Sequence, residues 1–203
     1  RNWNAWNKLA LATMSLGAFE EAERAFEKSI DLVPEKAEVR NNYGTLLLHL
    51  GRYEEAIEVL ERAMVQDSVV VEAVELLGIA YLQLNQRDKA IAMLERARIQ
   101  APGRWQTHYR LGLAHERLGT DAAAGAAFRR ALDLAPDEPM PYLHLARIHE
   151  RAGQQQAAVE ALRRFEALEP LKQEVDRYRQ AIRANPSHPA AYAELGMVFS
   201  RTG

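Results

Sequence analysis

The sequence predicts an all-α fold, a right-handed α–α superhelix (solenoid) of stacked helix pairs. Three observations support this prediction. Residue types recur every 34 positions, each period holds two stretches with apolar residues at helical spacing, and glycine or asparagine separates the two stretches. Because each helix pair buries its apolar face against its neighbours, the core of such a chain is spread along its length.

Residues of similar size recur at positions 34 apart, and each such set of equivalent positions is called a column below. The small residues of the first stretch are Ala10, Gly44, Gly78, Gly112 and Ala146. Those of the second stretch are Ala22, Ala56, Ala90, Ala124 and Ala158, followed four positions later by Phe26, Leu60, Leu94, Phe128 and Leu162. Small residues are needed where two helix backbones approach closely, and large apolar side chains fill the space beside them. The columns therefore predict tight pairing of the two helices.

Two further columns predict where the helices end. The turn between the two stretches falls at Gly17, Gly51, Asn85, Gly119 and Gly153. Glycine and asparagine can take the left-handed conformation that closes a helix. The second stretch ends at Pro34, Ser68, Pro102, Pro136 and Pro170. Proline lacks a backbone N–H and restricts the residue before it, so it predicts a stop.

These columns resemble the tetratricopeptide repeat. One period matches the family pattern with Leu111-Gly112, Ala124, Phe128, Ala131 and Pro136. Others match it with Leu77-Gly78, Tyr81, Ala90, Leu94, Ala97 and Pro102, and with Tyr43-Gly44, Ala56 and Ala63. The resemblance implies ligands bound along the concave surface made by the first helix of every repeat. We expect a segment of a larger bacterial protein of this family, because Arg1 opens directly into a helical pattern.

We expect one solenoid over 1–203. Its repeats are 3–36, 37–70, 71–104, 105–138 and 139–170, with an extra helix at 171–185 and a partial repeat at 189–203. Asp67 and Ser68 are expected to cap a helix, and Pro139 and Pro141 suit a first helical turn. The acidic pairs that follow the turns, Glu20-Glu21 and Glu54-Glu55, favour a helix N-terminus through its dipole.

The period breaks after the fifth repeat. Pro186 follows Pro170 by 16 residues instead of 34. The intervening segment predicts one helix, because its apolar residues have helical spacing: Leu171, Val175, Tyr178 and Ile182. Phe165 stands in a column that otherwise holds Ser29, Ala63, Ala97 and Ala131. A phenyl ring does not fit a close helix contact, so packing should change at the same place.

Composition limits the classes of function. The net charge of −2 gives no basic field for nucleic acid, and no apolar run is long enough to cross a bilayer. The absence of cysteine excludes disulfides, thiolate metal sites and cysteine nucleophiles. We expect no cofactor, no nucleic-acid partner and no membrane insertion. A soluble protein is expected, with the cytoplasm favoured over the periplasm.

Catalysis and metal binding have little support in the residues. The serines lack a Gly-x-Ser-x-Gly elbow, and the glycines occur singly rather than in a phosphate-binding loop. Four histidines crowd the fourth and fifth repeats and could be considered as metal ligands: His108, His115, His144 and His149. His115 and His149 stand where Tyr81 stands in the third repeat. We interpret them as polar aromatic residues hydrogen-bonded to their neighbours, and expect no enzyme.

The first helices supply the candidate binding surface. Positions are counted from the first residue of each repeat, so that Trp105 is position 1. Positions 2, 5, 9 and 12 form one stripe along the helix, with positions 6 and 13 beside it. Apolar residues at these positions are not needed to join the two helices of a pair. The candidate residues are Leu11, Met14, Asn41, Thr45, Leu48, Ile79, Leu82, Tyr109, Arg110, Leu113, Arg117, Arg147 and Arg151. The stripe is apolar in the first three repeats and charged in the last two.

Two subtypes of the family are disfavoured. Some members clamp a C-terminal carboxylate with lysines, asparagines and arginine at defined positions. The nearest frame here lacks both lysines: Asn41, Thr45, Leu76, Gln106 and Arg110. The sugar-transferase relatives carry an asparagine ladder at position 6, where this chain has only Asn42.

The resulting prediction is a non-enzymatic scaffold that binds a peptide or helix of a partner protein in its concave groove. We expect an apolar part of the ligand against the leucines and an acidic part near the arginines, with Glu116 and Glu150 close enough to neutralise them. Two alternatives stay open: a substrate-recruiting arm of a larger enzyme, and a structural subunit that associates end to end. For the last, we expect Leu195 and Phe199 to lack their usual partner helix.

Overall fold

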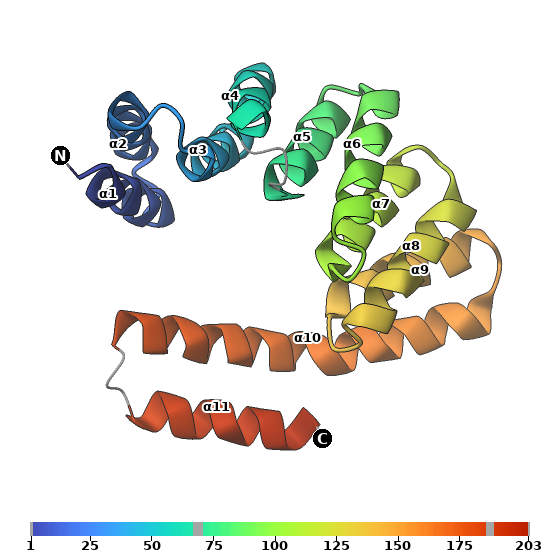
Figure 1. The fold of residues 1–203 in the computed structure, drawn as a ribbon. Coiled ribbons are helices and arrows are strands. Elements are labelled where there is room, and N and C mark those ends of the chain that lie inside the picture. Colours follow the sequence, from blue (N-terminus) through green and yellow to red (C-terminus); the bar gives the residue numbers. More distant parts are fainter. Residues whose placement is uncertain (1, 67–70, 186–188, 203) are drawn as a thin grey trace. The chain divides into compact units, whose positions relative to one another are not determined.

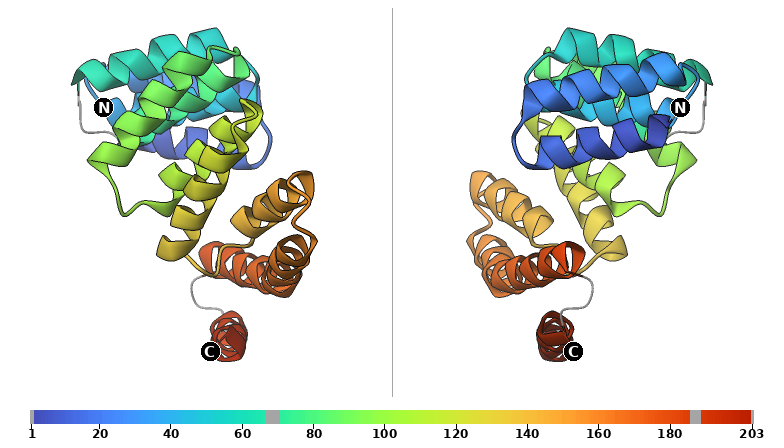
Figure 2. Two further views of the ribbon diagram at one scale, coloured as in Figure 1. Left: turned by 90° about the vertical axis from the view of Figure 1, so that its right-hand side faces the viewer. Right: turned by 90° about the vertical axis from the view of Figure 1, so that its left-hand side faces the viewer.

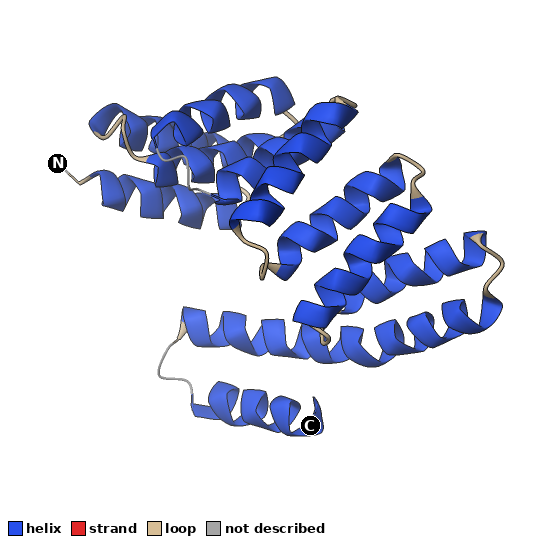
Figure 3. Ribbon diagram, turned by 45° about the vertical axis from the view of Figure 1, so that its right-hand side comes forward, coloured by secondary structure: helices blue, strands red, loops and turns tan. Residues whose placement is uncertain are grey.

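The computed structural model of the chain describes residues 2–66, 71–185 and 189–202. Over these residues the chain forms eleven helices and no strand (Figure 3). The helices of the first two repeats are α1 (Trp3–Ser15), α2 (Phe19–Leu32), α3 (Ala37–His49) and α4 (Tyr53–Gln66). Then follow α5 (Val71–Gln83), α6 (Arg87–Gln100), α7 (Trp105–Arg117), α8 (Asp121–Leu134), α9 (Pro139–Arg151), α10 (Gln155–Ala184) and α11 (Pro189–Thr202) (Figure 1). The all-α fold class is confirmed.

The chain divides into two compact units, Arg1–Thr120 and Asp121–Gly203. The N-terminal unit contains α1 to α7, and the C-terminal unit contains α8 to α11. Each unit is described by itself below. One continuous solenoid over 1–203 remains a prediction.

The turns within the helix pairs have the left-handed backbone that the sequence indicates. Gly17, Gly51, Gly119 and Gly153 have φ between 69° and 77°, and Asn85 has φ 56°. After α1, the N–H of Ala18 donates to the carbonyl of Thr13 at 2.9 Å. The same bond joins Gln86 to Tyr81 at 2.8 Å and Gln154 to His149 at 2.8 Å. Each bond satisfies a carbonyl that the end of the helix would leave open.

Helix pairs are held by a small residue against a large one. Gly44 and Gly78 lie so close to the partner helix that a Cβ on either would stand 2.6 Å from a carbon of Leu60 or Leu94. The alanine column is buried throughout, and Phe26, Leu60, Leu94 and Phe128 are fully buried. Leu162 is the exception, because 36% of it is exposed. The large residue of the column is therefore buried in the first four repeats and partly exposed in the fifth.

Successive repeats in the N-terminal unit are joined by position 7 of a first helix. The ring of Tyr43 packs against Phe26 of the preceding α2, with ring centroids 5.8 Å apart. Its hydroxyl donates to Glu23 at 2.8 Å. Burial first, and then the Glu23 carboxylate, raise the pKa of the Tyr43 phenol, so Tyr43 stays a neutral donor. Arg40, at position 4, donates to the carbonyl of Pro34.

The starts of the helices also follow the sequence. Glu20-Glu21 and Glu54-Glu55 lie in the first turns of α2 and α4. Pro139 begins α9, where its missing N–H costs little. The predicted cap formed by Asp67 and Ser68 lies outside the described residues.

The predicted separate helix at 171–185 is wrong. In the C-terminal unit α10 runs unbroken for 30 residues, with Pro170 inside it. A proline in a helix interior costs about 3 kcal/mol or more. The continuing turns are held by tertiary contacts: Lys172 pairs with Glu138 at 2.8 Å, Val175 is buried, and α11 packs beside the end of α10 (Figures 1 and 2). These contacts offset the cost of Pro170.

Ala90→Trp should lower the free energy of unfolding by roughly 1–3 kcal/mol or more, because an indole overpacks a contact that has room only for a methyl group. Ala90 is fully buried, whereas Ala92 on the same helix is exposed. Ala92→Trp is therefore the matched control and should change stability little. Urea denaturation followed by circular dichroism measures both. Equal effects of the two substitutions would contradict the helix pairing described above.

Pro170→Ala should stabilise the C-terminal unit by roughly 1–3 kcal/mol, because it restores a backbone hydrogen bond and relieves a ring clash within α10. Pro136→Ala is the control, because Pro136 lies between α8 and α9 and outside any helix. Calorimetric melting of both variants makes the comparison. If Pro136→Ala stabilises as much as Pro170→Ala, α10 is not continuous at Pro170.

Candidate protein-interaction surface

The first helices of the N-terminal unit form a contiguous series. α1 contacts α3, α3 contacts α5, and α5 contacts α7, so their inner faces adjoin one another. All candidate residues lie on these four helices except Arg147 and Arg151, which lie on α9 in the C-terminal unit. We name the inner face of α1, α3, α5 and α7 the inner surface.

The apolar candidates on the inner surface are only partly buried. Leu11 is 40% exposed, and Ile79 and Leu113 keep an intermediate exposure. Met14, Leu48 and Leu82 are also partly buried and pack against the core. These side chains thus contribute to the contact between first helices and still present apolar area to solvent.

The polar candidates have mostly local partners. The Thr45 hydroxyl donates to the carbonyl of Asn41 at 3.0 Å. The amide oxygen of Asn41 is buried without a hydrogen-bond partner among the described residues. Tyr109 lies beside Trp105, with ring centroids 6.2 Å apart.

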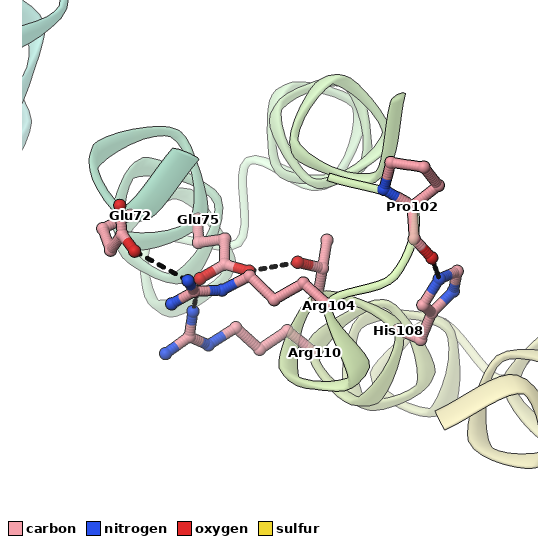
Figure 4. A network of polar contacts seen from close by, with 7 residues as sticks. Glu72, Glu75, Pro102, Arg104, His108 and Arg110 are labelled. Carbon is pink, nitrogen blue, oxygen red and sulfur yellow. Dashed lines mark hydrogen bonds and ion pairs between the residues drawn. The ribbon is translucent and has the colours of Figure 1, made fainter. Parts of the chain in front are cut away.

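A buried carboxylate on the inner surface was missed by the sequence analysis. Glu75, at position 5 of α5, is fully buried. It accepts hydrogen bonds from Thr107 and Arg110 of α7, and Arg104 approaches it at 3.2 Å (Figure 4). Arg104 also pairs with Glu72 at 2.7 Å. We name these five residues the Glu75 network.

The Glu75 network neutralises a buried charge, and only the Nε of Arg104 has no hydrogen-bond partner among the described residues of the network. A buried carboxylate is costly unless cations and donors surround it, and here two guanidinium groups and a hydroxyl do so. Figure 4 shows Arg104 and Arg110 extending side by side from the α7 side toward Glu72 and Glu75. The network therefore fixes the register of α5 against α7. A signal existed in the sequence: Glu75 is the one acid within the apolar stretch 73–82, and Arg110 follows it by 35 residues.

A second polar contact with the same spacing joins α1 and α3. Asn7 is buried at position 5, and its amide oxygen accepts a bond from Asn42, at position 6 of the next repeat, at 3.2 Å. The amide nitrogen of Asn7 donates to Glu38 at 3.4 Å. Like Glu75 with Arg110, this pair links positions 5 and 6 of successive repeats across 35 residues. Polar residues at these positions therefore serve the contact between first helices.

The four candidate arginines differ in how far they are engaged. Arg110 is held by Glu75, and Arg151 forms two bonds with Asp121 at 2.8 and 2.9 Å. The Arg151 hydrogen bond lowers the pKa of Asp121. Arg117 is exposed and donates to Gln83 at 3.2 Å, while Arg147 is exposed and forms no ion pair with any described residue. Two of the four candidate arginines therefore form ion pairs, with Glu75 and Asp121, which the sequence did not single out.

The histidines have structural partners. His108 is buried at position 4 of α7 and bonds the carbonyl of Pro102 at 3.0 Å, and His144 stacks on Phe128 at 4.9 Å. The ring nitrogens of His115 and His149 bond the turn residues Thr120 and Gln154 at 3.1 and 2.6 Å. Across residues 2–66, 71–185 and 189–202, no three acidic or histidine side chains are grouped for a metal ion. Of the helices in these ranges, none has the length and hydropathy of a membrane span.

Comparisons with known proteins agree with this architecture. A sequence profile described as tetratricopeptide repeat matches residues 5–68 and 75–139, and a second profile with the same description matches residues 142–172. The chain belongs to the tetratricopeptide repeat family. Proteins of this family are protein-interaction scaffolds and generally not catalysts. No curated protein matches the sequence.

Solved structures, among them those of MamA and PilW, are similar to the chain. A MamA structure is 25% identical, with a TM-score of 0.70 over 82% of this chain and 97% of that one. MamA from Desulfovibrio magneticus RS-1 is 24% identical, with a TM-score of 0.71 over 84% and 96%. PilW, a type IV pilus biogenesis factor, is 23% identical, with a TM-score of 0.74 over 98% and 83%. The similarities to MamA from Desulfovibrio magneticus RS-1 and to PilW show that these proteins share the fold of this chain.

Glu75→Gln should lower the free energy of unfolding by roughly 1–3 kcal/mol, because a neutral amide leaves Arg104 and Arg110 without a buried counter-charge. Glu72→Gln is the control: Glu72 is 47% exposed in its side chain, so the loss of its ion pair should cost about 1 kcal/mol or less. Urea denaturation at neutral pH measures both. Equal costs for the two substitutions would show that Glu75 is solvated rather than held in the Glu75 network.

Proposed function

We propose that the inner surface of the N-terminal unit binds a peptide or helix of a partner protein, and that the protein acts as a non-enzymatic scaffold. The observation that supports this proposal best is the row of partly exposed apolar side chains along adjoining first helices: Leu11, Met14, Leu48, Ile79, Leu82 and Leu113. Contiguous apolar surface of this kind generally marks a binding site.

Affinity on this surface should come from its apolar side chains. Full burial of a leucine-sized side chain contributes roughly 1.5–3 kcal/mol, and these side chains have already lost part of that area to the core. Several of them together are therefore needed for a stable complex. Exposed ion pairs contribute about 1 kcal/mol or less, so Arg117 at the edge should mainly affect orientation and association rate.

The polar contacts between first helices support a preformed surface. The Glu75 network holds α7 on α5, and the Asn7 contact holds α3 on α1. A surface whose helices are already fixed loses less conformational entropy when a ligand binds. Because Arg110 is engaged with Glu75, we place no ligand acid on Arg110. An acidic part of the ligand fits better beside Arg117.

Leu82→Arg and Leu11→Arg should each weaken binding at least about tenfold, because a guanidinium replaces apolar area that the ligand would cover. The probe is a fluorescent peptide selected from a displayed random library against the whole chain. Anisotropy titration gives the dissociation constants. Ile99→Arg is the matched control, because Ile99 is 71% exposed on α6, away from the inner surface.

Two outcomes would contradict the proposed site. One is a selected peptide whose binding is indifferent to both leucine substitutions. The other is equal weakening by Ile99→Arg. Leu11 is exposed enough that its substitution should leave the melting temperature unchanged, so loss of binding by that variant is not a folding defect. Arg117→Glu should slow association with an acidic peptide more at low salt than at high salt.

A further inference from the structure

The apolar side chains of the inner surface form a row that is up to two side chains wide. Positions 9 and 12 are neighbours on one face of a first helix, with Cβ atoms about 5–6 Å apart. The apolar residues at these positions are, from α1 to α7, Leu11 and Met14, Leu48, Ile79 and Leu82, and Leu113. α1 and α5 thus supply two side chains each, and α3 and α7 supply one each. A ligand that covers this row needs an apolar stripe of comparable width.

The spacing of the first helices sets the period of the ligand. Cα atoms of α1 and α3, of α3 and α5, and of α5 and α7 approach within 8 Å. Helices that pack in this way have axes about 8–10 Å apart. An α-helix that crosses them brings the same side back after seven residues, which is about 10.5 Å along its axis. A crossing that is oblique to the first helices brings the two lengths into agreement.

Extended ligands fit the row less well. Three residues of a β-strand cover about 10 Å, but an odd number of residues turns the side chain to the opposite face. A polyproline II helix brings one edge back after three residues, or about 9 Å, and so matches the spacing. It presents one residue per turn, which covers only half of the width at α1 and α5. Each heptad of an amphipathic α-helix presents two apolar residues and covers the full width.

Charges at the two borders of the row differ in sign. Position 2, where the first helices begin, holds Glu38 and Glu72. Glu72 is paired with Arg104, whereas Glu38 is exposed and accepts a bond from the neutral amide of Asn7 at 3.4 Å. Position 13, at the other border, holds the exposed Arg117 on α7. The row therefore has negative charge along one border and positive charge along the other.

We propose that the partner segment is an amphipathic α-helix whose apolar residues repeat every seven positions and which crosses the first helices from α1 to α7. This inference rests on the proposed function, because it names the ligand of the same surface. Three spacings of about 8–10 Å correspond to a helix of about 16–20 residues. Basic side chains on one flank of this helix face Glu38, and acidic side chains on the other face Arg117. These flanks fix the direction in which the helix lies.

Peptides of 20 residues, selected from a displayed random library against the whole chain, test this proposal. Circular dichroism difference spectra should show that the selected peptides gain helix on binding. Proline at a central polar position of the peptide should weaken binding at least about tenfold, because it breaks the helix, and alanine at the same position should change binding little. Glu38→Lys should weaken binding more at low salt than at high salt. Glu54→Lys, at an exposed site on α4, is the matched control.

Double-mutant cycles measure the spacing. Leu48→Ala on α3 and Leu82→Ala on α5 are each combined with alanine substitutions along the selected peptide. The peptide residue that couples to Leu48 and the one that couples to Leu82 should stand seven positions apart. Ile99→Ala, at an exposed apolar site on α6, is the control and should couple to no peptide residue.

Failure of this inference and failure of the proposed function give different results. Selected peptides that are weakened by Leu82→Arg but gain no helix, tolerate the central proline, or couple through residues two or three positions apart would overturn the helical ligand and leave the binding surface in place. Equal effects of Glu38→Lys and Glu54→Lys would overturn the charged flanks. Peptides that are indifferent to Leu82→Arg, or a library without any binder, would overturn the proposed function and this inference with it.

Discussion

The close approach of two helix backbones is the constraint on which the described repeats depend. At Gly44 and Gly78 there is no room for a Cβ, because a leucine of the partner helix occupies that space. The opposing alanine column is buried in the same way. Interdigitation of this kind fixes the angle and depth of a helix pair more strictly than apolar burial alone, because close-packed groups cannot slide past one another.

This pairing leaves the other sides of the first helices available for other roles. Positions 8 and 24 join the helices of a pair, and position 7 joins one repeat to the next. Positions 5 and 6 can therefore carry polar groups, and two repeats place Glu75 and Asn7 there. These buried polar groups are matched to partners 35 residues away, which specifies a register that leucine contacts alone would leave adjustable. Positions 9 and 12 remain at least partly exposed, and the proposed ligand site consists of the apolar residues among them.

The fifth repeat keeps this helix pairing but differs from the earlier repeats beyond it. Phe165 replaces the small residue of its column, and Leu162 is partly exposed instead of buried. α10 uses Ala158, Ala161 and Val175 as its buried stripe and continues past Pro170. α10 stays paired with α9 and extends beyond the pair, because neighbours cover its new turns. Val159 and Leu162 are 41% and 36% exposed, in contrast to the fully buried residues that precede Leu162 in its column.

The sequence by itself determined the fold class, the helix pairs of the first three repeats and the turns, because these depend on local properties that repeat at a fixed spacing. A missing Cβ at Gly44, a left-handed residue at Asn85 and a proline after a helix act within a few residues of themselves. The candidate stripe followed from the same periodicity, and its role in binding remains a proposal. The continuity of α10 and the partners of the arginines needed the tertiary structure. Pro170 breaks a helix unless distant contacts compensate, and a charge such as Arg110 is neutralised only by what the folded chain brings to it from 35 residues away.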